Sequence, residues 1–562
     1  MWILPFQERE RERESNRSSR CVINEIMKKN TSISIAQIVL FIFVLIFCEV
    51  FNISDHSTIN VQRGSKIHFI PETNPALRHC NYQNLFEQAI RENVFDPNLR
   101  KTGYCVVKDI QFGLDGNVYV AGMASLAGLL TVENDVIAYL KEDIDIFVAS
   151  FSPDLKTLHQ ATFFGGSEID YFGAMQIGPQ GEVYIAGTTY SSDFPGIPDK
   201  SKASPRNFMD YSSGFISLLS PDLKILHHTH LLKGNNDTFL YTLIIDPENN
   251  IYAAGTTSST IFPKTTGGAQ TSLSGFNDGF VAKLSPDLKT LYQTSYLGGS
   301  DYDGINSIQM GPEGDVYVVG TTFSSDFPGI QGGFQDTNVD NFNAFISKLS
   351  ADLSTIQQST YLVGSRGSNI LGIAFGPQGE LYVAGGTDSS DFPGTEGGAQ
   401  SSNGGGVFDG MVAMLSPDLK TLHQANYLGG IDMDVIYAMK IGPQGDIYVT
   451  GITRSPDFPG TIGGLQSSKR GELTGFIAKF SPDLKTMLQS SYLGGMGSDY
   501  PYSMIIDPQG FIYLAGTTTS SDFPGTQDSA FESMGKTSPN GFIAKLTLDL
   551  RTLYQATYTN WQ

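Results

Sequence analysis

The sequence predicts an all-β protein, a seven-bladed β-propeller of four-stranded antiparallel blades that follows an N-terminal signal or anchor segment. Two signatures support this prediction, and each recurs seven times with a period of about 65 residues. The first contains Tyr-x-x-Gly and is centred on Tyr119, Tyr184, Tyr252, Tyr317, Tyr382, Tyr448 and Tyr513. The second resembles Leu-Ser-Pro-Asp-Leu-Lys-Thr-Leu and contains Asp154, Asp222, Asp287, Asp352, Asp418, Asp483 and Asp549. A fixed period of this length is typical of a chain built from copies of one supersecondary unit.

Each unit contains four short strand candidates that form two hairpins. In the fourth unit the candidates are Asn306–Met310, Asp315–Thr321, Ala344–Leu349 and Thr355–Leu362. Gly-Pro-Glu-Gly makes the tight turn of the first hairpin, and Ser-Ala-Asp-Leu makes that of the second. Because no long helix interrupts the units, they predict propeller blades. A parallel β-helix, the alternative, has shorter and simpler coils.

The phase of the blades is a second prediction. By analogy with other propellers, the strand before the Gly-Pro-x-Gly turn is taken as innermost. The blades are then 105–166, 167–234, 235–299, 300–364, 365–430, 431–495 and 496–560. In this phase the loops after Tyr-x-x-Gly and after Tyr-Leu-Gly-Gly share one face, and the tight turns share the other. Two alternatives stay open: residues 59–70 help to close the ring, or the hairpin 541–558 completes a blade begun by 105–123.

Several segments identify a family resemblance. They are Asp278–Asp287, Tyr296–Ser300, Gly314–Gly320 and Ser324–Pro328, and their counterparts recur in register over about 105–560. These units resemble the SBBP repeats, the seven-bladed β-propeller repeats of exported bacterial proteins. The resemblance implies a propeller and export, and it implies no defined activity.

The N-terminal part divides into residues 1–51, a charged stretch with an export signal or membrane anchor, and residues 52–104, an irregular leader. Residues 38–48 are an uncharged apolar run preceded by Met27-Lys28-Lys29, and this order is typical of an export signal. Met27 is an alternative start to Met1. Cys48 ends a segment similar to a bacterial lipobox and is a candidate lipidation site; an uncleaved anchor is the alternative. We expect an exported protein of the cell envelope, membrane-anchored and either periplasmic or surface-exposed.

The formal net charge of −21 argues against nucleic acid as a partner, because phosphates would be repelled. The four cysteines all lie at or before Cys105. Cys80 and Cys105 either pair after export or remain isolated thiols, and the sequence leaves this open. We expect a monomer.

An acidic rim is the first candidate ligand-binding site. Four aspartates begin innermost strands on the loop side of the ring: Asp170, Asp303, Asp434 and Asp499. Together they predict a rim that attracts cations or basic segments. Asp301-Tyr302-Asp303-Gly304 resembles part of a calcium loop, but the further ligands of such a loop are missing, so no cofactor is predicted. The recurrent Ser-Ser-Asp-Phe-Pro-Gly around Asp326 is interpreted as turn chemistry, in which Asp caps backbone N–H groups and Phe packs.

Blade 2 departs from the repeat at two positions. His228 stands where the other six copies have Gln, and His230 where five of them have Thr or Ser. The two histidines share one face of their strand, which makes them candidate metal ligands, but no third ligand is identifiable and no metal site is predicted.

No catalytic motif is present, so the chain is not predicted to be an enzyme. The expected function is that of a membrane-tethered scaffold that binds a protein or carbohydrate ligand. Its contacts would come from variable loops at 197–214, 264–278, 330–343, 395–409, 461–474 and 526–540. One alternative is a lyase or hydrolase with its site at the acidic rim. Another is a purely structural surface protein.

Overall fold

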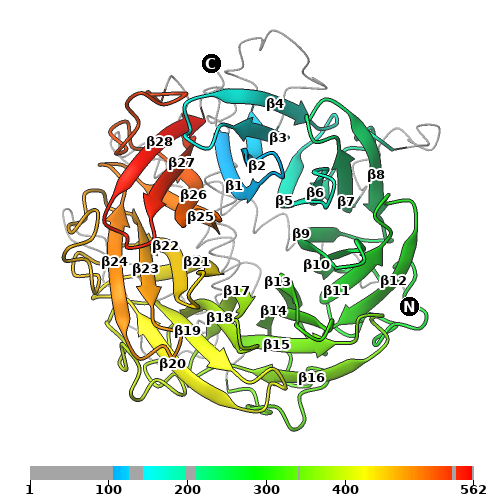
Figure 1. Cartoon of the computed structure of the whole chain (residues 1–562). Coiled ribbons are helices and arrows are strands. Elements are labelled where there is room, and N and C mark those ends of the chain that lie inside the picture. The colour runs from blue at the N-terminus through cyan, green and yellow to red at the C-terminus, as the bar shows by residue number, and fades with distance from the viewer. Residues whose placement is uncertain (1–104, 126–143, 198–210, 340–341, 535–538, 560–562) are drawn as a thin grey trace, which may run out of the picture. The chain divides into compact units, whose positions relative to one another are not determined.

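The computed structural model of the chain describes residues 105–125, 144–197, 211–339, 342–534 and 539–559. In these residues 28 strands form seven four-stranded antiparallel sheets, which stand as blades around a ring (Figure 1). The predicted seven-bladed propeller is therefore confirmed. The predicted signal or anchor segment, the leader with residues 59–70, and Cys48 and Cys80 lie outside the described residues.

The strands of each blade follow the chain from the innermost to the outermost position. Blades 1 and 2 contain β1 Cys105–Phe112, β2 Val118–Ser125, β3 Ile144–Phe151, β4 Leu158–Phe164, β5 Asp170–Ile177, β6 Val183–Thr189, β7 Ser213–Leu219 and β8 Leu226–Leu232. Blades 3 and 4 contain β9 Thr238–Ile245, β10 Ile251–Thr257, β11 Asp278–Leu284, β12 Leu291–Leu297, β13 Asp303–Met310, β14 Val316–Thr322, β15 Asn343–Leu349 and β16 Ile356–Tyr361. Blades 5 to 7 contain β17 Ser368–Phe375, β18 Leu381–Thr387, β19 Asp409–Leu415, β20 Leu422–Leu428, β21 Asp434–Ile441, β22 Ile447–Thr453, β23 Thr474–Phe480, β24 Met487–Leu493, β25 Asp499–Ile506, β26 Phe511–Thr518, β27 Asn540–Thr547 and β28 Leu553–Thr559.

The predicted blade phase is confirmed. The innermost strands contact one another around the ring, and β25 of blade 7 contacts β1 of blade 1. The last hairpin, β27–β28, pairs with β26, so the alternative in which it completes the first blade is wrong. At the closure the Asp109 carboxylate accepts hydrogen bonds from the Ser503 hydroxyl (2.9 Å) and the Met175 N–H (2.9 Å). One side chain of blade 1 thereby links blades 7 and 2.

The two repeated signatures are the two halves of one contact between neighbouring blades. The Tyr317 hydroxyl of blade 4 donates a hydrogen bond of 2.8 Å to the carbonyl of Pro417, in the β19–β20 turn of blade 5. Every blade repeats this bond to the next one, and the Tyr513 hydroxyl closes the ring by donating to the Pro153 carbonyl (2.7 Å). The tyrosine present in every copy therefore joins each blade to the next and stabilises the ring.

The leucine of the second signature shapes the turn that receives these contacts. Leu353 has a φ of 60° and its side chain is buried, while the Ser350 hydroxyl donates to the Asp352 carboxylate (2.6 Å). The left-handed backbone turns the Leu353 carbonyl outward, where it accepts a hydrogen bond from the Ala269 N–H of blade 3 (2.8 Å). The corresponding bond from Ala530 to Leu155 joins blade 7 to blade 1.

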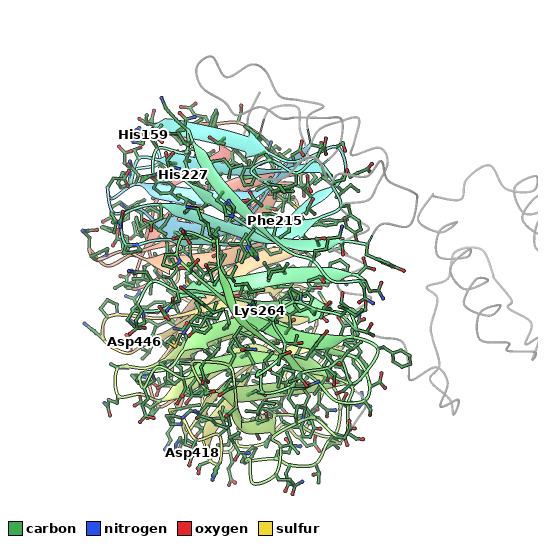
Figure 2. All side chains as sticks on the ribbon, turned by 90° about the vertical axis from the view of Figure 1, so that its right-hand side faces the viewer. His159, Phe215, His227, Lys264, Asp418 and Asp446 are labelled. Carbon is green, nitrogen blue, oxygen red and sulfur yellow. The ribbon has the colours of Figure 1, made fainter. Side chains whose placement is uncertain are left out.

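The long loops after the second strands do not lie wholly on one face, which corrects the sequence prediction. In blade 3 the loop runs beside the outermost strand, where the Thr294 N–H donates to the Lys264 carbonyl (2.9 Å) and the Tyr296 N–H to the Gln270 carbonyl (3.0 Å). The first half of the loop thus pairs with an edge that would otherwise be open. The second half, 271–277, lies beside the loop that enters blade 4, since Gly275 approaches the Asp301 backbone. Figure 2 shows Lys264 on the outer side of the ring and Asp418 and Asp446, from the tight turns, on one common side.

Candidate functional site

The four aspartates predicted to form an exposed acidic rim are buried. Asp170, Asp303, Asp434 and Asp499 begin β5, β13, β21 and β25, and each has 0% of its surface exposed. In the arrangement they share, Oδ2 of Asp303 accepts hydrogen bonds from the Gly299 N–H (2.7 Å) and the Ser324 hydroxyl (2.9 Å). The prediction of an exposed rim is wrong at these positions, because the carboxylates accept hydrogen bonds from backbone N–H groups and serine hydroxyls of the loops instead of facing water.

The Ser-Ser-Asp-Phe-Pro-Gly motif also holds loops together. Oδ1 of Asp326 accepts hydrogen bonds from the Ser300 N–H (2.8 Å) and the Ser300 hydroxyl (3.0 Å), and Phe327 is buried. The bond from the backbone N–H lowers the pKa of Asp326 below its usual value. The interpretation of this motif as turn chemistry is confirmed, with one addition: the capped backbone belongs to the loop that enters the blade.

A second buried aspartate faces three of the four from the preceding blade. Asp278 and Asp409 begin the third strands β11 and β19, Asp145 is the second residue of the third strand β3, and all three are at most 1% exposed. The Gly429 backbone shows how closely two carboxylates approach at the seam between blades 5 and 6. An ideal Cβ on this glycine would lie 2.3 Å from Oδ1 of Asp409 and 2.6 Å from Oδ2 of Asp434. The two oxygens are therefore no farther apart than the sum of these distances.

Burial raises the pKa values of the carboxyl groups in these pairs. Burial, with the Asp434 charge as a further cause, raises the pKa of Asp409 to about 7, and burial raises that of Asp434 to about 6. At the seam between blades 3 and 4, burial raises the pKa of Asp303 to about 7 and that of Asp278 above its usual value. Like charges this close are stabilised by one shared proton. Sequence reasoning missed the third-strand aspartates. The available signal was that Asp278 and Asp409, each followed by Gly, occur in blades whose next blade begins with Asp303 and Asp434.

Asp301 remains exposed on the loop face, where its Oδ1 accepts the Tyr302 N–H (2.9 Å). It therefore caps its own turn. Within the described ranges, no group of three or more His, Cys, Asp or Glu residues is placed to hold a metal ion.

The loop face carries exposed apolar side chains. Gly405 on the loop of blade 5 lies against the backbone of Ile431, which enters blade 6, and Gly275 approaches the carbonyl of Asp301 in the same way. The two kinds of loop therefore form neighbouring surfaces. Their exposed large hydrophobic residues are Tyr211, Ile261, Phe276, Val339, Val407, Ile431, Ile462 and Met496. On the opposite face, the described turns expose Leu114 and Ile225.

The innermost strands bring together three residues that sequence reasoning missed. Each innermost strand has a register shift at its fourth residue, which is Tyr437 in β21, Tyr502 in β25 and Lys108 in β1. The Tyr437 and Tyr502 ring centroids lie 5.3 Å apart, and the Lys108 ammonium lies 3.5 Å from the Tyr502 centroid. Burial lowers the pKa of Lys108 to about 7. No repeated residue marked this position in the sequence, because the seven blades have Lys, Gly, Tyr, Asn, Leu, Tyr and Tyr there.

His228 and His230 lie on β8, the outermost strand of blade 2, and line the same surface pocket of about 480 Å³. Nδ1 of His230 is 3.0 Å from the Leu288 carbonyl oxygen of blade 3.

No helix in the part of the chain that the structure describes is long and apolar enough to cross a membrane. Cys105 is buried, with its Sγ 3.3 Å from the Thr559 hydroxyl.

Residues 490–524 match the family model of SBBP, described as a beta-propeller repeat. The resemblance given by the recurring segments is confirmed by this match and by the seven-bladed ring. No curated protein matched the sequence.

Solved structures with some similarity come from varied proteins. An ulvan lyase from a new polysaccharide lyase family has a TM-score of 0.40 at 11% identity, over 73% of this chain and 89% of that one. BamB from Moraxella catarrhalis has a TM-score of 0.33 at 10% identity, over 78% and 92%. A protein of unknown function from Dyadobacter fermentans has a TM-score of 0.35 at 12% identity, over 64% and 94%. Similarity at this level says nothing about activity or partners.

Proposed function

We propose that the chain is an exported, membrane-tethered binding scaffold that contacts a protein or carbohydrate ligand through its loop face. One observation carries the proposal. Exposed apolar side chains lie on the loops, whereas the polar side chains of the repeated motifs make hydrogen bonds within and between the blades. Phe276 is 78% exposed and Ile431 62% exposed, although water disfavours such surface. The binding role requires no catalysis.

The charge around these side chains favours a particular kind of partner. Asp301 and Asp432 are exposed beside the loops that carry Phe276 and Ile431. A partner with an apolar centre and basic rim would match this surface, and the net charge of −21 would speed its approach. This is the part of the acidic rim that remains accessible.

Photo-crosslinking in the cells that encode the chain tests the proposal. A benzophenone amino acid replaces Phe276 or Ile431 in the full chain, and Leu114 in a control. Leu114 is 69% exposed on the opposite face, so it matches the test positions in accessibility. We expect light-dependent adducts of higher mass at the two loop positions and not at Leu114. Adducts only at Leu114, or at no position, would contradict a binding role for the loop face.

The membrane tether has an independent test. Mass analysis of the mature N-terminus should find a lipidated Cys48, which would fix the compartment and the anchor together. An intact apolar run 38–48 would instead identify an uncleaved anchor, whereas a soluble chain without either would contradict the tether.

Catalysis is a second candidate function, and one observation favours it. The four carboxylates of the predicted acidic rim are buried and cannot meet a substrate, but burial lowers the pKa of Lys108 to about 7, and its ammonium lies over the Tyr502 ring, which packs against Tyr437. An amine of that pKa is suited to general-base work. A polysaccharide and ester screen with the wild type and Lys108→Met would decide. Turnover lost in the variant supports catalysis, and no turnover in either protein contradicts it.

A further inference from the structure

Blade 2 replaces a repeated glutamine with an imidazole. In blade 3 the aligned Gln293 side-chain amide donates hydrogen bonds to the loop carbonyls of Lys264 (2.7 Å) and Thr266 (3.3 Å), and Gln358 makes equivalent bonds in blade 4. His228 occupies this position in β8 and lines a pocket instead. The strand position that holds the loop through a glutamine in blades 3 and 4 therefore carries an imidazole in blade 2.

The second imidazole has a defined tautomer. Nδ1 of His230 lies 3.0 Å from the Leu288 carbonyl oxygen, which can only accept a hydrogen bond, so Nδ1 carries the proton. Nε2 is then left with a free lone pair. A histidine whose other ring nitrogen is held by a carbonyl is the usual form of a metal ligand.

The strand places both rings on one side. Residues two apart on a strand point the same way, so His228 and His230 share a face and His227 points away and is exposed. Thr229, Leu231, Ile197 and Lys289 complete the pocket lining. The Lys289 ammonium lies 3.6 Å from the Asp287 carboxylate, which offsets its charge.

We propose that His228 and His230 chelate a divalent transition-metal ion of the kind imidazole prefers, such as Zn²⁺, Cu²⁺ or Ni²⁺, with water completing the coordination. This site lies on the outer rim of blades 2 and 3 and is separate from the loop face. Two protein ligands make it an open site with exchangeable positions.

The other blades supply conservative test variants. His228→Gln restores the residue of the six other copies, and His230→Thr restores the residue found in blade 1. In blade 1 the Thr162 hydroxyl donates to the Leu223 carbonyl (2.6 Å), the same interblade bond that His230 makes to Leu288. Both variants should therefore fold, and thermal unfolding would verify this.

Calorimetric titration of the full chain with Ni²⁺, and nitrogen couplings in the Cu²⁺ electron paramagnetic resonance spectrum, test the site. We expect one metal equivalent to be lost, or bound at least tenfold more weakly, in His228→Gln and in His230→Thr. His227→Gln, on the same strand but the opposite face, should bind like the wild type. Unchanged binding in the two folded variants, or an equal loss in His227→Gln, would overturn the proposal.

Discussion

Two neighbouring seams of the ring have the same backbone and different chemistry. At the seam between blades 5 and 6, Asp409 and Asp434 meet beside Gly429. At the seam between blades 4 and 5 the aligned residues are Asn343, Ser368 and Val363. The backbone at the aligned glycine and valine is held alike, since the Gly429 N–H donates to the Gln400 side chain (3.2 Å) and the Val363 N–H to the Gln335 side chain (3.1 Å).

The comparison explains why one aligned position is a glycine at the first seam, Gly429, and a valine at the second, Val363. A side chain at 429 would strike two carboxylates, whereas Val363 is buried without such a pair beside it. The glycines at 165 and 298 likewise stand beside carboxyl pairs. Gly494 is also a glycine, although it stands beside Asp499 alone and the third-strand position there is Thr474, so this glycine of the Tyr-Leu-Gly-Gly signature follows the aspartate of the innermost strand and not the loop alone.

Gly429→Ala should have the largest effect on stability. The new methyl group would force the two carboxylates apart at a buried seam, and we expect a loss of about 3 kcal/mol in the free energy of unfolding. Urea denaturation measures it. Adding Asp409→Asn and Asp434→Ser, which reproduces the seam between blades 4 and 5, should recover at least half of the loss. No recovery would show that the glycine is needed for another reason.

Asp409→Asn should stabilise the ring at alkaline pH. The folded pKa of about 7 lies above the usual 3.8, so the folded chain binds the extra proton between these values. Stability from this group is therefore complete at acidic pH and falls as pH rises toward 7. At about pH 8 we expect the variant to gain about 2 kcal/mol over the wild type, and at about pH 5 much less. An equal difference at both pH values would contradict a shared proton.

The tyrosine contact should contribute equally at both seams. The Tyr317 hydroxyl donates to Pro417 between blades 4 and 5, and the Tyr382 hydroxyl to Pro482 between blades 5 and 6 (2.7 Å). Tyr317→Phe and Tyr382→Phe should each cost about 1 kcal/mol in thermal or urea unfolding, with no dependence on pH between about 5 and 8. A clearly unequal cost would mean that the seams differ beyond their carboxyl pairs.

The smallest effect is expected on the loop face. Phe276→Ser removes an exposed side chain, so the free energy of unfolding should change by less than about 0.5 kcal/mol. The same variant should lose partner adducts at Ile431, while Leu114→Ser keeps them. A large loss of stability would show that Phe276 supports the fold and would contradict its role in binding.

The sequence predicted the ring, its blade phase and its strands because each repeat carries its own turn chemistry and hydrophobic pattern. It also predicted that the Asp326 motif is structural. The exposure of Asp303 and its counterparts was mispredicted, because a period places a residue along its strand but does not show what faces it from the next blade. Asp278 and Asp303 are 25 positions apart in sequence and meet only when two blades pack.

The parts of the candidate site that escaped prediction depend on packing around the ring. Lys108 and Tyr502 lie in the first and last blades and become neighbours only when the ring closes. The path of the long loops along the outermost strands was also missed, since it depends on backbone groups such as the Lys264 carbonyl, which every residue has.

The central claim is that the repeated aspartates form buried carboxyl pairs and not an exposed acidic rim. A ¹³C nuclear magnetic resonance titration of the aspartate side-chain carboxyls tests it most directly. The pairs should give carboxyls that titrate near pH 6 to 7, and Asp409→Asn should remove one such transition. If every aspartate carboxyl instead titrates below about pH 5, as exposed groups do, the buried pairs are contradicted.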